Sequence, residues 1–293
     1  MDLSPGQIHR FQKDILAWFA QNKRDLPWRH TRDPYDILVS EVMLQQTQVS
    51  RVLAKYQEWL ALFPTVRDLA QAPQAIVLRA WSGLGYNRRA LNLYKTAHMI
   101  MEKHQGYFPQ STAALKELPG IGDYTARAVA CFAFDKQVAV VDTNVRKVIL
   151  LTFFSHCHCE EEPACRQAGR RSNLSYQRDC HASLAMTGKK LQQIADQLLP
   201  RGHAYEWNQA LMDYSAAVLA KERVPLPKQS KFIGSNRYWR GQILKQLLLY
   251  GATAKLVLYN QLGHENREQF EKILDELEQE GFIIQEEKLV RIA

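Results

Sequence analysis

The stretch STAALKELPGIGDYTARAVACFAFDKQVAVVDTNVRK, residues 111–147, decides the fold, because it predicts three helices joined by two different connections. A short helix over Thr112 to Glu117 breaks at Leu118 to Gly122, where two glycines can adopt positive φ or admit another backbone closely. The helix Tyr124 to Phe134 follows, with Asp123 as its predicted N-cap. Such a hairpin directs backbone N–H groups and a positive helix end at one point, which suits a phosphate oxygen.

An aspartate follows the second of these helices. The apolar run Val138 to Val141 leads to Asp142, and the helix Thr143 to Phe154 begins directly after it. An aspartate at a helix start is often only an N-cap that contributes about 1 kcal/mol, and a glycine hairpin alone is often only a loop. The two features together favour a functional site.

A carboxylate also lies on an apolar helix face. Asp33-Pro34 predicts a helix start, and the helix Tyr35 to Leu44 places Glu41 on one face with three apolar residues. Burial of a carboxylate costs free energy unless the group is paired or protonated. Glu41 therefore has a partner or a raised pKa that serves chemistry. Its apolar neighbours are Ile37, Leu38 and Leu44.

The motifs resemble a known family. LPGIGDYTA and VVDTNV resemble the helix-hairpin-helix DNA glycosylase superfamily, with its glycine hairpin and downstream catalytic aspartate. LPWR (26–29), DPY (33–35) and SEVMLQQTQV (40–49) resemble its adenine DNA glycosylase, or MutY-type, branch. The resemblance runs from about Ile8 to Lys221 with one interruption. It implies a mostly α-helical, two-lobed glycosylase fold.

The resemblance also implies roles for individual residues. Glu41 matches the general acid at adenine N7, and Asp142 matches the carboxylate that faces positive charge developing on the sugar. Asn144 would orient Asp142. Tyr124 lies where bifunctional relatives carry a Schiff-base lysine, so a monofunctional enzyme is expected. The expected DNA-binding and base-binding residues are Arg29, Leu44, Gln45, Gln46, Tyr86, Arg88, Gly120, Ile121, Gly122 and Gln209, with Leu44 and Tyr86 as wedges and Arg88, Arg89 and Lys95 near phosphates.

Composition limits the class of protein. The 293 residues allow two domains, and a net charge of +8 favours a polyanionic partner. No apolar run reaches the length of a membrane span, and the first ten residues lack a signal-peptide core. An odd number of cysteines, 5, is typical of free thiols in a reducing compartment. We expect a bacterial cytoplasmic protein associated with the nucleoid.

A segment of about 155–189, rich in cysteine and histidine, interrupts the resemblance and is interpreted as an inserted loop. Its thiolates and imidazoles could bind zinc, but their spacing matches no familiar zinc pattern, so no metal is expected. Downstream, WNQALMDYSA resembles the helix that leads into four iron–sulfur cysteines in the family. No cysteine follows Cys180, and such a cluster needs four thiolates. The sequence predicts a member without the cluster and without another cofactor.

The C-terminal part has a different pattern. We predict a catalytic domain over 1–223, a linker over 224–237 and a small domain over 238–293. Helices over Tyr238 to Leu249, Ala254 to Gln261 and Glu265 to Gln279, then a β-pair, resemble a winged helix. The third helix is acidic, which predicts packing or protein contact in place of DNA reading. Without a cluster, packing of Val224, Leu226, Phe232 and Ile233 is expected to hold the segment 219–233.

The sequence thus predicts an adenine DNA glycosylase of base excision repair. Its substrate is double-stranded DNA in which adenine is mispaired with guanine or 8-oxoguanine, and a protein partner would bind the acidic C-terminal domain. A thymine or uracil glycosylase for G·T or G·U mismatches is the alternative enzyme. A non-catalytic DNA-binding or adaptor protein is the alternative outside enzymes.

Overall fold

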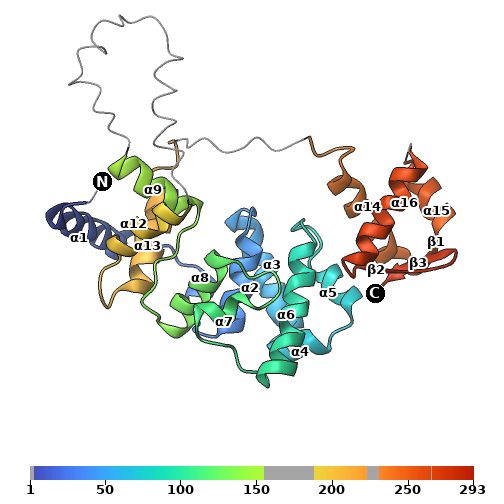
Figure 1. The fold of residues 1–293 in the computed structure, drawn as a ribbon, viewed down its shortest axis with the longest axis horizontal. Helices are drawn as coiled ribbons and strands as arrows, with labels where there is room; N and C mark the ends of the chain where they lie inside the picture. The colour runs from blue at the N-terminus through green and yellow to red at the C-terminus, as the bar shows by residue number, and fades with distance from the viewer. Residues whose placement is uncertain (1–2, 155–187, 223–230, 265) are drawn as a thin grey trace, which may run out of the picture. The chain divides into compact units, whose positions relative to one another are not determined.

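The computed structural model describes residues 3–154, 188–222, 231–264 and 266–293, which are mostly α-helical (Figure 1). In chain order the elements are α1 (Pro5–Asn22), η1 (Pro27–Arg29), α2 (Pro34–Leu44), α3 (Val49–Leu62), α4 (Val66–Gln71), α5 (Gln74–Ala80), α6 (Arg88–His104), α7 (Thr112–Lys116), α8 (Asp123–Phe134), α9 (Thr143–Phe153), α12 (Gly188–Leu198), α13 (Ala204–Ala217), α14 (Asn236–Tyr250), β1 (Thr253–Ala254), α15 (Lys255–Leu262), α16 (Arg267–Gln279), β2 (Ile283–Glu286) and β3 (Leu289–Ile292).

The chain forms two compact units. The first unit comprises Met1–Pro34, Gln110–Thr112 and Gly122–Leu226. The second unit comprises Tyr35–Pro109, Ala113–Ile121 and Pro227–Ala293. None of the helices in the described ranges is both long and apolar enough to span a membrane.

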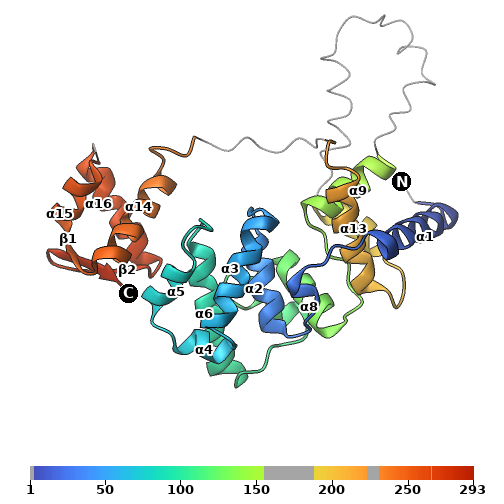
Figure 2. The same cartoon turned by 180° about the vertical axis from the view of Figure 1, so that it is seen from behind.

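The core of the first unit lies where α13 packs against α1 and α9 (Figure 2). The helical spacing of apolar residues in α1 buries Ile15 and Phe19 on this side. Trp207 and Leu211 of α13 belong to the same cluster. Other buried members are Val145, Val148, Ile149, Leu191, Ile194, Leu198 and Ala210. This core supports the start of α9, which carries Asp142.

A buried ion pair fixes the segment after α1 to α13. Asp213 has a fully buried side chain, and Arg29 donates to both of its oxygens at 2.7 and 2.8 Å. Arg24 adds its backbone amide at 3.0 Å and its Nε at 2.7 Å. Burial by itself raises the pKa of Asp213, but the hydrogen bonds from Arg29 and Arg24 outweigh burial and hold that pKa below its usual value.

We predict that Asp213→Asn lowers the free energy of unfolding at pH 7 by about 3 kcal/mol, because it leaves Arg29 buried without its counter-ion. The lowered pKa makes this contribution present above about pH 4 and lost as pH falls through the lowered value. The measurement is urea unfolding of both proteins from neutral to acid pH. The difference between them should shrink below pH 4; a difference that is constant with pH would contradict the assignment.

The second unit contains a helix that is buried on almost every side. Every residue of α2 from Tyr35 to Met43 except Asp36 is buried, including Ser40 and Glu41. Tyr35 donates from its hydroxyl to the Phe63 carbonyl at 2.8 Å, and Trp59 Nε1 donates to the Tyr35 hydroxyl at 3.1 Å. In the same unit α6 packs against α4 and α5.

The described residues from 231 onward form the C-terminal module. Its strands make an antiparallel sheet of order β1-β3-β2, with Val290 paired to Thr253 on one side and Gln285 on the other. Helices α14 and α16 pack against this sheet through Ile243, Leu247, Phe270, Ile273, Leu274 and Leu277. The predicted order of three helices and a β-pair is confirmed. The two-residue strand β1 was not predicted, because it is too short to show alternation.

Most element predictions are confirmed. The sequence predicts a helix over Val49 to Leu62, and α3 has these bounds. It also predicts a capping box at Thr65 to Asp68, which the structure shows with hydrogen bonds of 3.0 and 3.2 Å. α14 begins at Asn236, inside the predicted linker over 224–237. The predicted insertion over 155–189 lies outside the described residues except for its last two positions. The domain boundaries remain a prediction.

Three predictions are wrong. Asp123 is the first residue of α8 and not its cap; Gly122 is the N-cap, and Asp123 accepts from Arg127 one turn later at 3.1 Å. The apolar spacing of Trp207, Leu211, Tyr214 and Val218 predicts a helix over Tyr205 to Lys221, but α13 ends at Ala217. Val218 therefore lies beyond the helix and is 48% exposed. Phe232 and Ile233 are 53% and 72% exposed, so their packing does not hold the segment before α14; Val224 and Leu226 lie outside the described residues.

Candidate active site

Gly120 occupies a position where the backbone conformation and a close neighbour leave no room for a side chain. Its φ is +73°, and an added Cβ would lie 2.3 Å from Asn92 Nδ2 and 2.6 Å from Asn92 Cβ. The neighbouring Pro119 carbonyl accepts from the Thr96 hydroxyl at 2.9 Å, so α6 contacts the hairpin at two adjacent residues. Gly122, in contrast, has a φ of −85° and open space where its Cβ would be. The sequence could not distinguish these two glycines.

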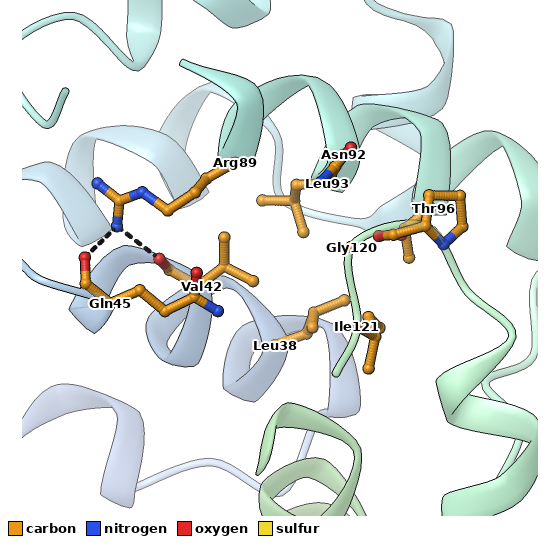
Figure 3. A pocket seen from close by; sticks show the side chains of 10 residues that line it. Leu38, Val42, Gln45, Arg89, Asn92, Leu93, Thr96, Gly120 and Ile121 are labelled. Carbon is orange, nitrogen blue, oxygen red and sulfur yellow. Dashed lines mark hydrogen bonds between the residues drawn. The ribbon is translucent and has the colours of Figure 1, made fainter. Parts of the chain in front are cut away.

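Ile121 belongs to the hairpin interior. Its side chain is 7% exposed, and its amide donates to the Leu118 carbonyl at 3.2 Å within the turn. Because the Ile121 amide is already used within the turn, the amides of Gly120 and Gly122 are the predicted phosphate donors that remain. A cavity of about 40 Å³ lies beside it, lined by residues of α2 and α6 (Figure 3). That volume admits water and excludes a nucleobase, so the cavity is a packing gap and not a substrate pocket.

We predict that Gly120→Ala lowers the free energy of unfolding by about 2 kcal/mol or more, from left-handed strain and from the clash with Asn92. The matched control is Gly122→Ala, which introduces the same methyl group in an allowed conformation with free space. It should change that free energy by less than about 0.5 kcal/mol. Denaturant unfolding of both variants is the measurement, and equal losses would contradict the distinction.

Arg89, in the second unit, donates hydrogen bonds to the chain on both sides of it, at the end of α2 and in the loop before α6 (Figure 3). Its Nη1 donates to the carbonyls of Val42, Met43 and Gln45 at 2.8, 3.0 and 2.7 Å. Its Nη2 donates to the Thr47 hydroxyl at 3.2 Å and to the carbonyls of Leu84 and Gly85 at 3.0 and 3.1 Å. Burial lowers the pKa of Arg89 to about 10, so the group stays charged at neutral pH. The prediction that Arg89 contacts phosphate is wrong.

Arg89 joins two loops, here named the wedge loops, that carry the predicted DNA-binding residue Gln46 and the predicted wedge Tyr86; the other predicted wedge, Leu44, is the last residue of α2. One loop follows α2 and contains Gln46, whose φ is +53°; the other precedes α6 and contains Tyr86, whose φ is +49°. A left-handed conformation costs a non-glycine residue about 1–2 kcal/mol and persists only where surrounding contacts impose it. Gln46 is exposed and Tyr86 is 39% exposed, as a role in contacting a ligand requires. Leu44 and Gln45 are half-buried.

We predict that Arg89→Lys lowers the free energy of unfolding by about 3 kcal/mol, because an ammonium group cannot reach acceptors on both loops and leaves several buried carbonyls without donors. Arg88→Lys is the matched control on the adjacent, 70% exposed side chain, and it should change stability by less than about 0.5 kcal/mol. Chemical denaturation decides between them. A tolerated Arg89→Lys would show that the loops do not depend on the guanidinium.

Asp142 caps α9 as predicted. Its Oδ1 accepts from the Val145 amide at 2.6 Å, and its Oδ2 accepts from Asn144 Nδ2 at 2.7 Å. Burial raises the pKa of Asp142 even though these hydrogen bonds oppose the change. The carboxylate is thus oriented by short hydrogen bonds but poorly solvated. Such an anion interacts strongly with any positive charge placed before it.

The connector before Asp142 depends on a residue that the sequence analysis missed. Asn208, which is 1% exposed on α13, accepts from the Val140 amide at 2.8 Å and donates to the Val138 carbonyl at 3.0 Å. Gln192 of α12 donates to the Ala139 carbonyl at 3.1 Å. The sequence offered one signal for this role: Asn208 is a polar residue next to the apolar Trp207, on the face of α13 that is buried.

The other predicted catalytic and base-binding residues lie on different units. Glu41 of α2, in the second unit, is 5% exposed, which confirms its predicted burial. In the first unit, Tyr124 is half-buried in the first turn of α8, and Gln209 is 6% exposed on α13. The side chain of Arg29 is 10% exposed and pairs with Asp213. Arg29 therefore has a structural role as the partner of Asp213, and this geometry does not support the prediction that it binds DNA.

The described residues do not provide the thiolates of an iron–sulfur cluster. Cys131 is the cysteine that lies in the described ranges, and it is buried in α8. Asn208 Nδ2 lies 3.3 Å from its sulfur, and burial raises the pKa of Cys131 to about 12. A thiol that resists ionisation is a poor metal ligand. Within the same ranges, no group of three or more His, Cys, Asp or Glu side chains could hold a metal ion.

Comparison with known proteins identifies the family. Residues 39–168 match the model of the HhH-GPD superfamily base excision DNA repair protein. A thymine/uracil-DNA glycosylase of Methanothermobacter thermautotrophicus is 32% identical over 214 residues, which cover 73% of this chain and 86% of that protein. The chain belongs to the HhH-GPD superfamily of base excision DNA repair proteins.

Two further relatives refine this assignment. The HhH-GPD chain is 50% identical over 145 residues to the adenine DNA glycosylase of Mycobacterium tuberculosis, which covers 49% of this chain and 48% of the relative. The chain spans about half the length of the mycobacterial adenine DNA glycosylases that it matches. The structure of a thermostable thymine-DNA glycosylase matches with a TM-score of 0.61 and 30% identity, over 76% of this chain and 92% of that one. The predicted fold class is confirmed.

Proposed function

We propose that this protein is an adenine DNA glycosylase that hydrolyses the N-glycosidic bond of adenine mispaired with guanine or 8-oxoguanine. One observation carries the proposal. A carboxyl group is buried on α2, and a second carboxylate caps α9, at the positions where the resemblance places the two catalytic acids. The 50% identity to a mycobacterial adenine DNA glycosylase supports adenine as the base.

Glu41 is the proposed general acid. Adenine is a poor leaving group, and protonation at N7 lets it depart as a neutral base. Glu41 is buried on α2, and the proposed role requires that it carry a proton when the bond to adenine breaks. The proposal requires that the extruded adenine reach Glu41.

Asp142 is the proposed stabiliser of the sugar. As the bond to adenine breaks, positive charge develops on the deoxyribose, and a fixed anion nearby lowers the free energy of that state. The Val145 amide and Asn144 hold the carboxylate oxygens in place, so little reorganisation is needed during the reaction. Burial of the Asp142 side chain also weakens the screening by water of its interaction with the new charge.

Tyr124 supports hydrolysis without strand cleavage. It lies at the start of α8, where the resemblance places the amine of bifunctional enzymes. A phenol cannot form a Schiff base with the opened sugar, so water is the nucleophile and an abasic site is the product. Gly122 has open space on its Cβ side, which would let a phosphate approach the backbone at the start of α8. Such an enzyme would work on the bacterial nucleoid.

A thymine or uracil glycosylase is the second candidate, and a specific observation favours it. The thymine/uracil-DNA glycosylase relative is matched over 86% of its length, whereas the adenine DNA glycosylase of Mycobacterium tuberculosis is matched over 48%. Base release from duplexes containing A·8-oxoguanine, A·G, T·G and U·G separates the candidates. We expect release of adenine only, with strand breaks appearing only after alkali. Release of thymine or uracil without adenine would replace the proposal by the second candidate.

We predict that Glu41→Gln and Asp142→Asn each lower the single-turnover rate of base release by about 10²-fold or more, because each removes a proton or a charge used in the transition state. DNA affinity should change less than about threefold, since the ground-state contacts remain. Glu58→Gln is the control, because it makes the same chemical change at a 59% exposed carboxylate. Full activity in either test variant would contradict the assigned roles.

We propose that the protein works without an iron–sulfur cluster, and we predict that purified protein is colourless and contains no stoichiometric iron. A chelator should leave its melting temperature unchanged, because removal of a structural metal would remove folding free energy. Elemental analysis and thermal denaturation with and without chelator are the measurements. About one equivalent of zinc or iron, lost together with stability, would instead show a metal site in the segment 155–187, which lies outside the described residues.

A further inference from the structure

A large cavity lies between the wedge loops and the C-terminal module, within the second unit. Its volume is about 880 Å³. One wall comes from the loops around Gln46 and Tyr86 and from Arg51 of α3. The other wall comes from the residues before α14 and from its first turns, including Phe232 and Arg237. The proposed function uses only the first wall.

The arginines around this cavity differ in what they contact. Arg89 donates from both Nη atoms to groups of the two loops, and Arg240 pairs with Glu276 at 3.3 Å and with Glu280 at 2.6 Å. Arg51 is exposed and makes no ion pair with any described residue. Arg237 likewise has no carboxylate partner in the described part of the chain. These two side chains carry positive charge available to an anionic ligand.

Arg237 lies between two exposed aromatic rings. Its Cζ is 5.4 Å from the centroid of Tyr86 and 5.3 Å from that of Phe232. Its Nη1 also donates to the Tyr86 hydroxyl at 2.9 Å. Arginine and aromatic side chains in one groove are typical of surfaces that bind nucleic acid strands, because phosphates pair with the guanidinium and unstacked bases stack on the rings. Phe232 is 53% exposed and is available for such stacking.

The acidity of α16 does not oppose this use of the module. Glu276 accepts from Asn236 at 3.0 Å as well as from Arg240, and Glu280 pairs with Arg240. The lysine that contacts this end of the module, Lys95 of α6, donates to the Glu280 carbonyl at 2.8 Å. The prediction of packing or protein contact in place of DNA reading concerned the acidic third helix, which is α16. The cavity wall comes instead from α14, the residues before it, Glu280 and Phe282.

We propose that this cavity binds a strand of the DNA substrate beside the wedge loops, with phosphates on Arg51 and Arg237 and a base against Phe232. The C-terminal module is then a second DNA-binding wall. The inference rests on the proposed function only in taking double-stranded DNA as the ligand. It makes no use of the chemistry of Glu41 or Asp142.

The test is the salt dependence of DNA affinity, measured on Glu41→Gln protein with a duplex containing an A·G mismatch. Each phosphate contact contributes about 0.9 to the slope of log affinity against log salt. Arg237→Ala should lower this slope by about 0.9 and weaken binding about tenfold. Arg51→Ala, on the opposite wall, should do the same. In the double variant the slope should fall by about twice as much as in either single variant. Lys245→Ala is the matched control, because it removes an exposed charge of α14 outside the cavity.

Two further variants separate charge from the positioning of Tyr86. Tyr86→Phe removes the acceptor of the Arg237 hydrogen bond and keeps both arginines, so the slope should stay as in the parent. Arg237→Lys keeps the charge and should recover most of the slope. An Arg237→Ala slope equal to that of Lys245→Ala would overturn the proposal. Tighter binding by Arg237→Ala would also overturn it, by showing that the module covers Tyr86 and competes with DNA.

These outcomes are independent of the reaction. If the parent protein releases no adenine while the slopes change as expected, the proposed function fails and the second DNA-binding wall remains. If adenine is released and the slopes do not change, the function remains and the second wall is excluded. Thermal denaturation of Arg237→Ala and Lys245→Ala, compared at equal salt, checks that the module is folded in both.

Discussion

The buried guanidinium of Arg89 is the contact on which the candidate DNA-binding loops depend. It donates to backbone carbonyls at the end of α2 and in the loop before α6, and these acceptors lie within four residues of Gln46 and Tyr86. Burial of a charged group costs free energy, which the ring of acceptors offsets only when both loops adopt this arrangement. The left-handed conformations of Gln46 and Tyr86 are therefore a consequence of the Arg89 site, and the loops are preorganised before any ligand binds.

The first unit shows the same design around a different charge. Asp213 on α13 holds Arg24 and Arg29, and Asn208 on the same helix holds the connector that leads to Asp142. The helix α13 thus supports the connector that leads to Asp142. Because Asp142 is oriented through backbone contacts of its connector, the α12 and α13 contacts matter to its position although neither helix carries it. This network uses no metal among the described residues.

Local patterns predicted the elements and the burial of Glu41, because helical spacing, proline and capping residues act within a few positions. They did not distinguish residues whose roles depend on distant partners. Arg88 and Arg89 are adjacent on α6, yet one is exposed and the other is enclosed by two loops. Gly120 and Gly122 both belong to the hairpin motif, and the positive φ of Gly120 and the position of Asn92 separate them. Nor could the sequence place the start of α14 against the loop of Tyr86, because that contact joins residues far apart in the chain.

A crystal structure of Glu41→Gln protein bound to a mismatched duplex tests the central claim most directly. If the loops are preorganised, Gln46 and Tyr86 keep positive φ in the complex, and Arg89 keeps its carbonyl partners on both loops. The opposite result is a complex in which either loop rebuilds with negative φ, or in which Arg89 leaves its carbonyls to contact a phosphate. That result would show that DNA, and not Arg89, shapes the binding surface.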